Sequence, residues 1–322
     1  MKKLRYVCTT GPSMNDINII EKLCILGLRI VRFNMSYRNK CMIEELLPQI
    51  QELNVNKNYN IETMVDLCGP EIRIDIENSL EIKKDCIYIL GIDIKVKEGD
   101  ISVLEKNDLL IFGDGEIKFK VIKNDNGLIR CISLDNGILK KNKKITNEKL
   151  CKTTQFISER DERDINDAIK YNVNYLCISF VNNVDDIKKV KVLTKNSKIK
   201  IIAKIETKEG FENLKDIIQF VDGVMIGRGD LGVRFDICKI GFIQKEICKI
   251  VKENNKKLIV GTGFLSSMKN SNIPTRAEVN DLYNTYLDGI DMIMFSGETA
   301  SSISPENVLM TANKIVGNVV GR

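Results

Sequence analysis

The stretch IIAKIETKEG, residues 201–210, joins the end of an apolar run to a pair of opposite charges. Residues 201–203 are typical of a buried strand, whereas Lys204 and Glu206 follow on alternate positions. Residues two apart in a strand point to the same side, so a cation and an anion are predicted to emerge side by side. The stretch therefore predicts a buried strand that ends in a functional pair of charges.

Similar apolar runs, short and rich in β-branched residues, recur along the chain, each followed by a helical pattern. The eight runs are 4–10, 29–34, 62–67, 175–180, 200–205, 223–228, 257–262 and 292–297. Helix signals support this alternation, because Thr275 and Glu278 form a predicted capping box and Pro305 follows a predicted N-cap at Ser304. Eight strands alternating with helices predict an α/β fold, a parallel (β/α)8 TIM barrel of about 250 residues.

One segment, from about Pro70 to Lys152, breaks this rhythm. Its strand signals come closely spaced, separated by turn sequences such as FGDGE and KNDNG, with no convincing helix. We expect a small all-β domain, a β-barrel lid, inserted between barrel strands three and four. The predicted domains are residues 1–69 plus 153–322 for the catalytic barrel and 70–152 for the insertion.

The composition is that of an ordinary globular protein, with 322 residues, 43% hydrophobic, 29% charged and a net charge of +5. Histidine is absent, which excludes Ser-His, Cys-His and His-metal mechanisms. The ten cysteines show no metal-type pairing. No signal peptide opens the chain, and no apolar run approaches the ~18 residues of a membrane span. We therefore expect a reducing cytoplasm and no membrane partner. No nucleic-acid partner is expected either, because the basic residues form no aromatic-interleaved surface.

In a TIM barrel, catalytic residues gather at the carboxyl ends of the strands. Here these ends carry Arg32, Asn34, Ser36, Asp66, Ser179, Lys204, Glu206, Arg228, Asp230, Thr262, Ser296 and Glu298. Each has a structural explanation when taken alone, such as a helix cap or an Arg32–Asp66 ion pair. Together, so many charges need hard cations and an anionic ligand to balance them. Glu206 and Asp230 could hold Mg²⁺ beside Lys204, an arrangement suited to phosphoryl transfer.

Seven motifs of the chain resemble those of the pyruvate kinase family in order and spacing. They are CTTGPS (8–13), VRFNMS (31–36), VDLCGPEIR (65–73), AKIETKEG (203–210), GRGDLGV (227–233), PTRAEVND (274–281) and MFSGETA (294–300). The resemblance covers nearly the whole chain. It implies a β/α barrel with an inserted small β-domain, and transfer of phosphate from phosphoenolpyruvate to ADP, giving pyruvate and ATP with Mg²⁺ and K⁺.

The resemblance also implies roles for individual residues of this chain. The implied catalytic residues are Lys204, which would stabilise the migrating phosphoryl group, Thr262, near the proton-delivery route, and Arg32. The implied substrate-binding residues are Arg32, Ser179, Lys204, Gly229, Asp230 and Thr262. The implied nucleotide-binding residues are Arg32, Asn34, Arg73, Lys143 and Lys144. Mg²⁺ would be held by Glu206 and Asp230, and K⁺ by Asn34, Ser36, Asp66 and the backbone carbonyl of Leu67.

Several positions depart from the family pattern. Leu67 and Cys68 replace a Thr-Lys pair, Tyr37 replaces a nucleotide-side histidine, and Arg234 stands where an acid is usual. Gly263 and Ser266 replace Gln and Glu. We also expect the family's C-terminal effector domain to be absent, while pairing through the barrel into a homodimer is implied. These departures leave two alternatives open: a paralogue acting on another acceptor or 2-oxo acid, and a non-catalytic protein that binds phosphoenolpyruvate or nucleotide.

Overall fold

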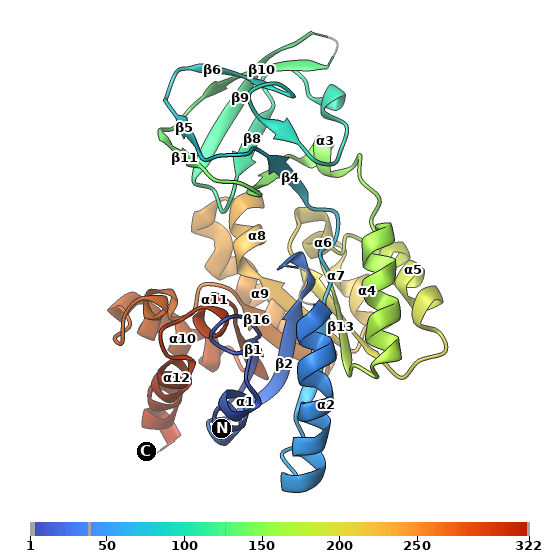
Figure 1. Ribbon diagram of the computed structural model, residues 1–322, viewed down its shortest axis with the longest axis vertical. Coiled ribbons are helices and arrows are strands. Elements are labelled where there is room, and N and C mark those ends of the chain that lie inside the picture. The colour runs from blue at the N-terminus through green and yellow to red at the C-terminus, as the bar shows by residue number, and fades with distance from the viewer. Residues whose placement is uncertain (1–3, 38–39, 126, 321–322) are drawn as a thin grey trace. The chain divides into compact units, whose positions relative to one another are not determined.

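The computed structural model describes residues 4–37, 40–125 and 127–320, coloured along the chain in Figure 1. Eight parallel strands form a closed barrel in the order β1-β17-β16-β15-β14-β13-β3-β2. Their bounds are β1 Arg5–Thr9, β2 Leu28–Asn34, β3 Glu62–Asp66, β13 Tyr175–Ile178, β14 Lys200–Ile205, β15 Gly223–Gly227, β16 Lys257–Gly261 and β17 Met292–Phe295. Each predicted run overlaps one of these strands, so the predicted TIM barrel is confirmed.

Helices alternate with the barrel strands. Their bounds are α1 Ile17–Ile25, α2 Lys40–Lys57, α4 Glu159–Lys170, α5 Val184–Thr194, α6 Lys208–Glu212, α7 Leu214–Ile217, α8 Arg228–Arg234, α9 Ile240–Glu253, α10 Arg276–Leu287, α11 Gly297–Ala300 and α12 Pro305–Val320. The predicted capping box is present at α10, where Thr275 and Glu278 bond each other's backbone N–H groups. The Ser304 hydroxyl accepts a bond from the Asn307 N–H at 3.2 Å, which confirms the predicted start of α12 at Pro305.

The barrel interior is a packed hydrophobic cluster to which every strand contributes. Its members are Val7, Ile30, Met64, Tyr175, Cys177, Ile202, Met225, Ile259, Met292 and Met294. Because side chains alternate between the two faces of a strand, the residue two positions after a cluster member also points toward the barrel axis. The interior cluster thereby fixes which residues face the axis at the carboxyl ends of the strands.

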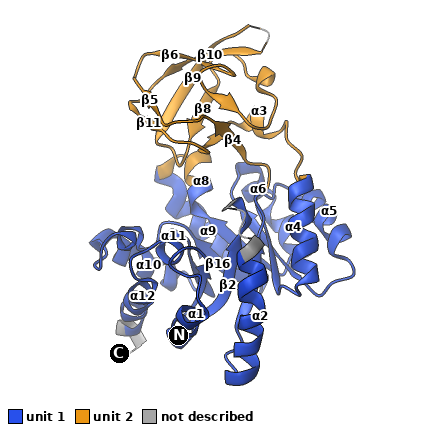
Figure 2. Cartoon of the chain, viewed as in Figure 1, with its two compact units in different colours: residues 1–68, 159–231, 238–322 blue, residues 69–158, 232–237 orange. Residues whose placement is uncertain are grey.

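The chain divides into two compact units, shown in Figure 2. Unit 1 comprises residues 1–68, 159–231 and 238–322, and unit 2 comprises residues 69–158 and 232–237. Most of unit 2, residues 69–158, lies in the chain between β3 and β13, barrel strands three and four. Residues 232–237, which follow barrel strand six, were not predicted to cluster with the insertion.

Unit 2 is built from antiparallel strands around its own buried core, which includes Ile74, Phe112 and Phe119. The bounds are β4 Ile72–Asp75, β5 Leu80–Ile82, β6 Ile87–Leu90, β7 Lys95–Val96, β8 Leu109–Phe112, β9 Ile117–Asp125, β10 Leu128–Ser133, β11 Gly137–Leu139, β12 Lys144–Thr146 and α3 Glu148–Cys151. The strands form a seven-stranded sheet, with β6 and β7 at its edges, and a separate β5–β11 pair. The sequence predicts a β-barrel lid here, whereas the structure has a sheet with two edges and a separate strand pair. The sequence pattern also did not predict the short helix α3, capped by Asn147, because four residues are too few to show a helical periodicity.

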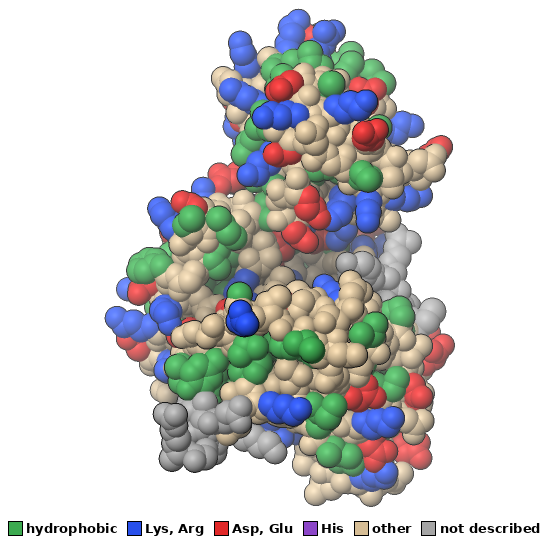
Figure 3. Space-filling model, turned by 90° about the vertical axis from the view of Figure 1, so that its left-hand side faces the viewer, with side chains coloured by type: hydrophobic (Ala, Val, Ile, Leu, Met, Phe, Trp, Pro, Cys, Tyr) green, Lys and Arg blue, Asp and Glu red, His purple; other side chains and the backbone are tan. Residues whose placement is uncertain are grey.

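The surface carries a mixture of charges. On the face shown in Figure 3, Lys and Arg side chains are interspersed with Asp and Glu. Within the described ranges, no helix is long and apolar enough to cross a membrane. Cys8, Cys131 and Cys177 are buried free thiols, and burial raises the pKa of each, so they serve as small hydrophobic residues.

Candidate active site

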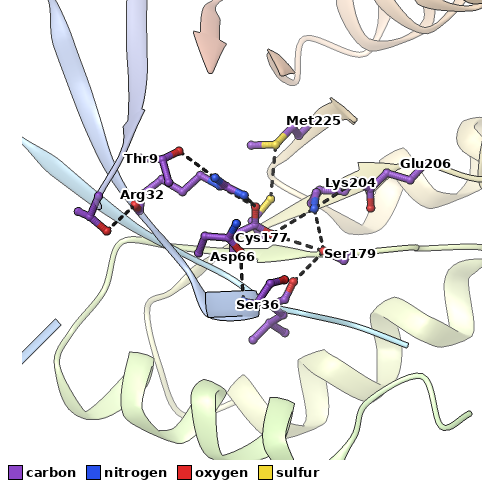
Figure 4. A network of polar contacts seen from close by, with 12 residues as sticks. Thr9, Arg32, Ser36, Asp66, Cys177, Ser179, Lys204, Glu206 and Met225 are labelled. Carbon is purple, nitrogen blue, oxygen red and sulfur yellow. Dashed lines mark hydrogen bonds and ion pairs between the residues drawn. The ribbon is translucent and has the colours of Figure 1, made fainter. Parts of the chain in front are cut away.

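Four barrel strands carry polar residues directly beyond the interior cluster. Two positions after Ile30, Met64, Cys177 and Ile202 come Arg32, Asp66, Ser179 and Lys204. The strand alternation that buries the first set therefore directs the second set toward the barrel axis, at the carboxyl end. Figure 4 shows these side chains linked by polar contacts.

Arg32 and Asp66 form a buried ion pair between neighbouring strands. The Arg32 Nε and Nη2 atoms lie 2.7 and 2.6 Å from Asp66 Oδ2, and only 4% of Arg32 is exposed. The third guanidinium nitrogen, Nη1, donates to the Thr9 hydroxyl at 2.8 Å. Burial alone would raise the pKa of Asp66, but the cations Lys204 and Arg32 outweigh it and lower the pKa. The Arg32–Asp66 ion pair that was suggested as a structural explanation is thus present. It also fixes the positively charged guanidinium of Arg32 at the carboxyl end of the barrel.

Lys204 lies at the centre of the network. Its Nζ atom is 2.8 Å from Ser179 Oγ, 3.1 Å from Glu206 Oε1 and 3.4 Å from Asp66 Oδ1. Burial would lower the pKa of Lys204, but the two carboxylates outweigh it and raise the pKa, so the ammonium keeps its charge at neutral pH. The predicted side-by-side pair of Lys204 and Glu206 is confirmed.

Glu206 is 2% exposed and fixed at both oxygens, because Oε2 accepts the Phe180 N–H at 3.1 Å while Oε1 faces Lys204. Burial raises the pKa of Glu206 to about 7, against the effect of Lys204 and with added repulsion from Asp230 and Asp66. Asp66 and Glu206 thus contact the cations Arg32 and Lys204, and Asp230 adds a third acid near Glu206.

Glu206 and Asp230 are the acids that could hold a metal ion. A methyl group on Gly227 would lie 2.4 Å from Glu206 Oε1, so the bare glycine leaves the space that this carboxylate fills. No group of three or more His, Cys, Asp or Glu side chains with metal-binding geometry occurs within the described ranges. Mg²⁺ needs only one or two carboxylates when water and substrate oxygens complete its shell. Glu206 and Asp230 supply the number of carboxylates that such a site would need, and their role toward Mg²⁺ stays a prediction.

Thr262, directly after β16, has a backbone φ of +76°. Positive φ is a strained conformation for a β-branched residue and is concentrated at functional sites. The Thr262 side chain packs over Gly229 in the first turn of α8, where an added methyl would lie 3.0 Å from Thr262 Cγ2. The predicted substrate contacts Gly229, Asp230 and Thr262 therefore lie near one another at the ends of β15 and β16.

The predicted K⁺ ligands lie at the ends of β2 and β3 or directly beyond them. The Asn34 side-chain oxygen accepts the Ser36 N–H at 3.1 Å, which fixes the turn after β2. The Leu67 carbonyl accepts a bond from Ser179 Oγ at 2.7 Å, and Asp66 Oδ1 lies 3.5 Å from the same hydroxyl. Neutral and carboxylate oxygens of this kind suit a hard cation.

Three predicted nucleotide contacts belong to unit 2, where each has an acidic neighbour. Arg73 pairs with Glu71 at 2.5 Å, Lys143 with Glu116 at 2.5 Å and Lys144 with Asp114 at 3.5 Å. Their roles toward nucleotide stay predictions. Among the departures, Arg234 donates to Cys151 Sγ at 3.5 Å and Gly263 has a φ of +87°. Cys68 is buried at 8% exposure, and the Tyr37 side chain lies outside the described part of the structure.

Sequence reasoning missed three supporting groups: the Thr9 hydroxyl that holds Arg32, the Phe180 N–H that holds Glu206, and the space at Gly227. Thr9 stands at the end of the first strand and could have been included by its position. The other two depend on a backbone N–H and on a missing side chain, which a residue-type pattern does not reveal.

Comparisons with known proteins agree with this geometry. Residues 1–309 match the family model described as pyruvate kinase, barrel domain. The chain is 35% identical to a pyruvate kinase of Buchnera aphidicola, covering 98% of this chain and 69% of that protein. It is 31% identical to one of Thermotoga maritima, covering 98% and 70%. A solved pyruvate kinase from Cryptosporidium parvum has a TM-score of 0.89 and 28% identity, over 98% of this chain and 68% of that one.

The relatives are longer than this chain, which spans 56% of a Staphylococcus saprophyticus pyruvate kinase at 31% identity. The match nevertheless runs through both the barrel and the insertion. The chain belongs to the pyruvate kinase family.

Proposed function

We propose that this chain is a phosphotransferase that moves phosphate from phosphoenolpyruvate to ADP, giving pyruvate and ATP. The observation that carries the proposal is the position of Lys204, whose ammonium contacts Asp66, Glu206 and Ser179 at the carboxyl end of the barrel. A fixed cation beside a pair of acids suits phosphoryl transfer, where catalysis is mostly positioning and charge neutralisation.

The side chains of the barrel divide the work. Lys204 neutralises charge on the migrating phosphoryl group, and Arg32 supplies a second positive charge held in place by Asp66 and Thr9. Thr262 lies against the substrate carboxylate and the route by which the enolate gains its proton. The backbone amides of Gly229 and Asp230 hold that carboxylate. Ser179 fixes the direction of the Lys204 ammonium through their 2.8 Å bond.

Glu206 and Asp230 would hold Mg²⁺, which supplies positive charge to phosphoryl and enolate oxygens when bound. The proposed K⁺ ligands are Asn34, Ser36, Asp66 and the Leu67 carbonyl. The residues proposed to contact the phosphates of ADP are Arg32, Asn34, Arg73, Lys143 and Lys144. The reaction would belong to cytoplasmic glycolysis, and the expected assembly is a homodimer through the barrel.

The test uses the purified chain with phosphoenolpyruvate, ADP, Mg²⁺ and K⁺, and measures pyruvate over time. We expect turnover that is lost when Mg²⁺ is omitted and strongly reduced when Na⁺ replaces K⁺. A folded protein that binds phosphoenolpyruvate but forms no pyruvate with ADP or other nucleoside diphosphates would refute the proposal. That result would favour a different acceptor or a purely binding role.

A further inference from the structure

Thr262 is held in its strained backbone conformation by contacts that neither substrate nor metal explains. Its φ of +76° is followed by a φ of +87° at Gly263, so two consecutive residues occupy the left-handed region. A β-branched residue is strained in that region and persists there only where its surroundings enforce it.

The enforcing contacts converge on one arginine. Arg228 Nε donates to the Thr262 carbonyl oxygen at 2.9 Å. The other two guanidinium nitrogens each lie 2.8 Å from one carboxylate oxygen of Asp281 in α10, a bidentate pair. The guanidinium also stacks on the Phe264 ring, 3.9 Å from its centroid, and Nη1 lies 3.4 Å from the Gln244 side-chain oxygen.

These contacts fix the guanidinium in position and direction. A bidentate carboxylate sets the plane of the fork, and the stacked ring restricts motion across that plane. The remaining N–H then points at one target, the Thr262 carbonyl, and so determines the orientation of the Thr262 peptide.

We propose that Arg228 and Asp281 form a positioning clamp for Thr262, acting through its backbone carbonyl to orient the Thr262 hydroxyl in the site. The proposal rests on the proposed function for the role of Thr262 and adds two residues that act through it. Arg228 and Asp281 are positioning residues. Arg228 bonds the Thr262 carbonyl, and Asp281, in α10, holds Arg228 in place.

The kinetic test combines Asp281→Asn with Thr262→Ala. Asn keeps the shape of Asp281 but removes its charge and one of its two acceptors. Because a 1 Å misplacement of a catalytic group can cost about a hundredfold, we expect kcat to fall about tenfold to a hundredfold with KM for phosphoenolpyruvate nearly unchanged. In the double variant, no further loss beyond Thr262→Ala is expected, because the clamp has nothing left to position.

Two further variants sharpen this test. Arg228→Lys keeps the charge but cannot reach Asp281 in bidentate fashion and Thr262 at once, so it should behave like Asp281→Asn. Asp185→Asn, which removes a carboxylate from a surface pair with Lys188, is the matched control and should leave kcat unchanged. An unchanged kcat in Asp281→Asn, or losses that multiply with Thr262→Ala, would overturn the clamp.

A second readout does not depend on catalysis. With threonine methyl groups labelled by ¹³C, the Thr262 resonance is assigned by its absence in Thr262→Ala. It should move in Asp281→Asn and stay in place in Asp185→Asn, whether or not the protein forms pyruvate. A Thr262 resonance unmoved by Asp281→Asn would refute the clamp, whereas a moved resonance without pyruvate formation would refute only the proposed activity.

Discussion

Replacing Gly227 with alanine would test whether activity depends on the position of the Glu206 carboxylate. The added methyl would lie 2.4 Å from Glu206 Oε1 and 2.6 Å from its Cγ. Ordinary contact needs roughly 3.5 Å, so the carboxylate must retreat by about 1 Å. It cannot do so freely, because Phe180 and Lys204 hold its two oxygens at 3.1 Å each. A displacement of this size costs about a hundredfold in activity.

The assay is pyruvate formation as a function of Mg²⁺ concentration. We expect Gly227→Ala to lower kcat about a hundredfold and to raise the Mg²⁺ concentration needed for half-maximal rate. Gly241→Ala is the matched control, because a methyl there, at the start of α9, meets no atom within 4 Å apart from its chain neighbours and the nearby backbone of its own helix. If Gly227→Ala keeps both the rate and the Mg²⁺ dependence of the parent, the tight placement of Glu206 does not matter to activity.

Two further predictions concern the support of the site and the stability of the barrel. Ser179→Ala removes the hydrogen bonds to Lys204 and to the Leu67 carbonyl. We expect the free energy of unfolding to fall by about 1–3 kcal/mol and kcat to fall about tenfold. An unchanged kcat would contradict the role of Ser179 in directing the Lys204 ammonium. Burial raises the pKa of Asp164 to about 6, above its usual 3.8, so its ionisation weakens the folded state progressively as pH rises from about 4 to 6. After allowance for solvent screening, Asp164→Asn should therefore be more stable than the parent by about 1–2 kcal/mol at pH 7 and equally stable below pH 4. Urea unfolding at the two pH values measures the difference. A gain in stability that is larger at low pH would contradict the reasoning.

The barrel could be predicted from sequence because each of its strands is buried. A strand covered by helices on one side and packed inside a barrel on the other reads as a continuous apolar run, as in residues 200–205. The capping box at Thr275 was equally readable, since it depends on two residues three apart. By contrast, the sheet of unit 2 depends on pairing between short strands that are distant in the sequence, such as β4 with β12. No local sequence pattern determines which of these strands pair, or whether the sheet closes into a barrel.

The candidate site was predictable where the alternation of side chains along a strand determines which side chains point to the same side. Lys204 and Glu206 meet because they lie two residues apart at one strand end, and Asp66 joins them because β3 and β14 both flank β13. Contacts that depend on the third dimension were not predictable. The bond from Arg228 to the Thr262 carbonyl, and the positive φ that it holds, arise from the meeting of β15, β16 and α10.

The most direct measurement compares pyruvate formation by the parent chain, Lys204→Met and Cys68→Ala. Methionine keeps much of the length of the lysine side chain but removes the ammonium that contacts Asp66 and Glu206. We predict that Lys204→Met forms no detectable pyruvate while remaining folded and binding phosphoenolpyruvate, and that Cys68→Ala turns over at nearly the parental rate. Turnover by Lys204→Met at the parental rate would contradict the role assigned to this ammonium.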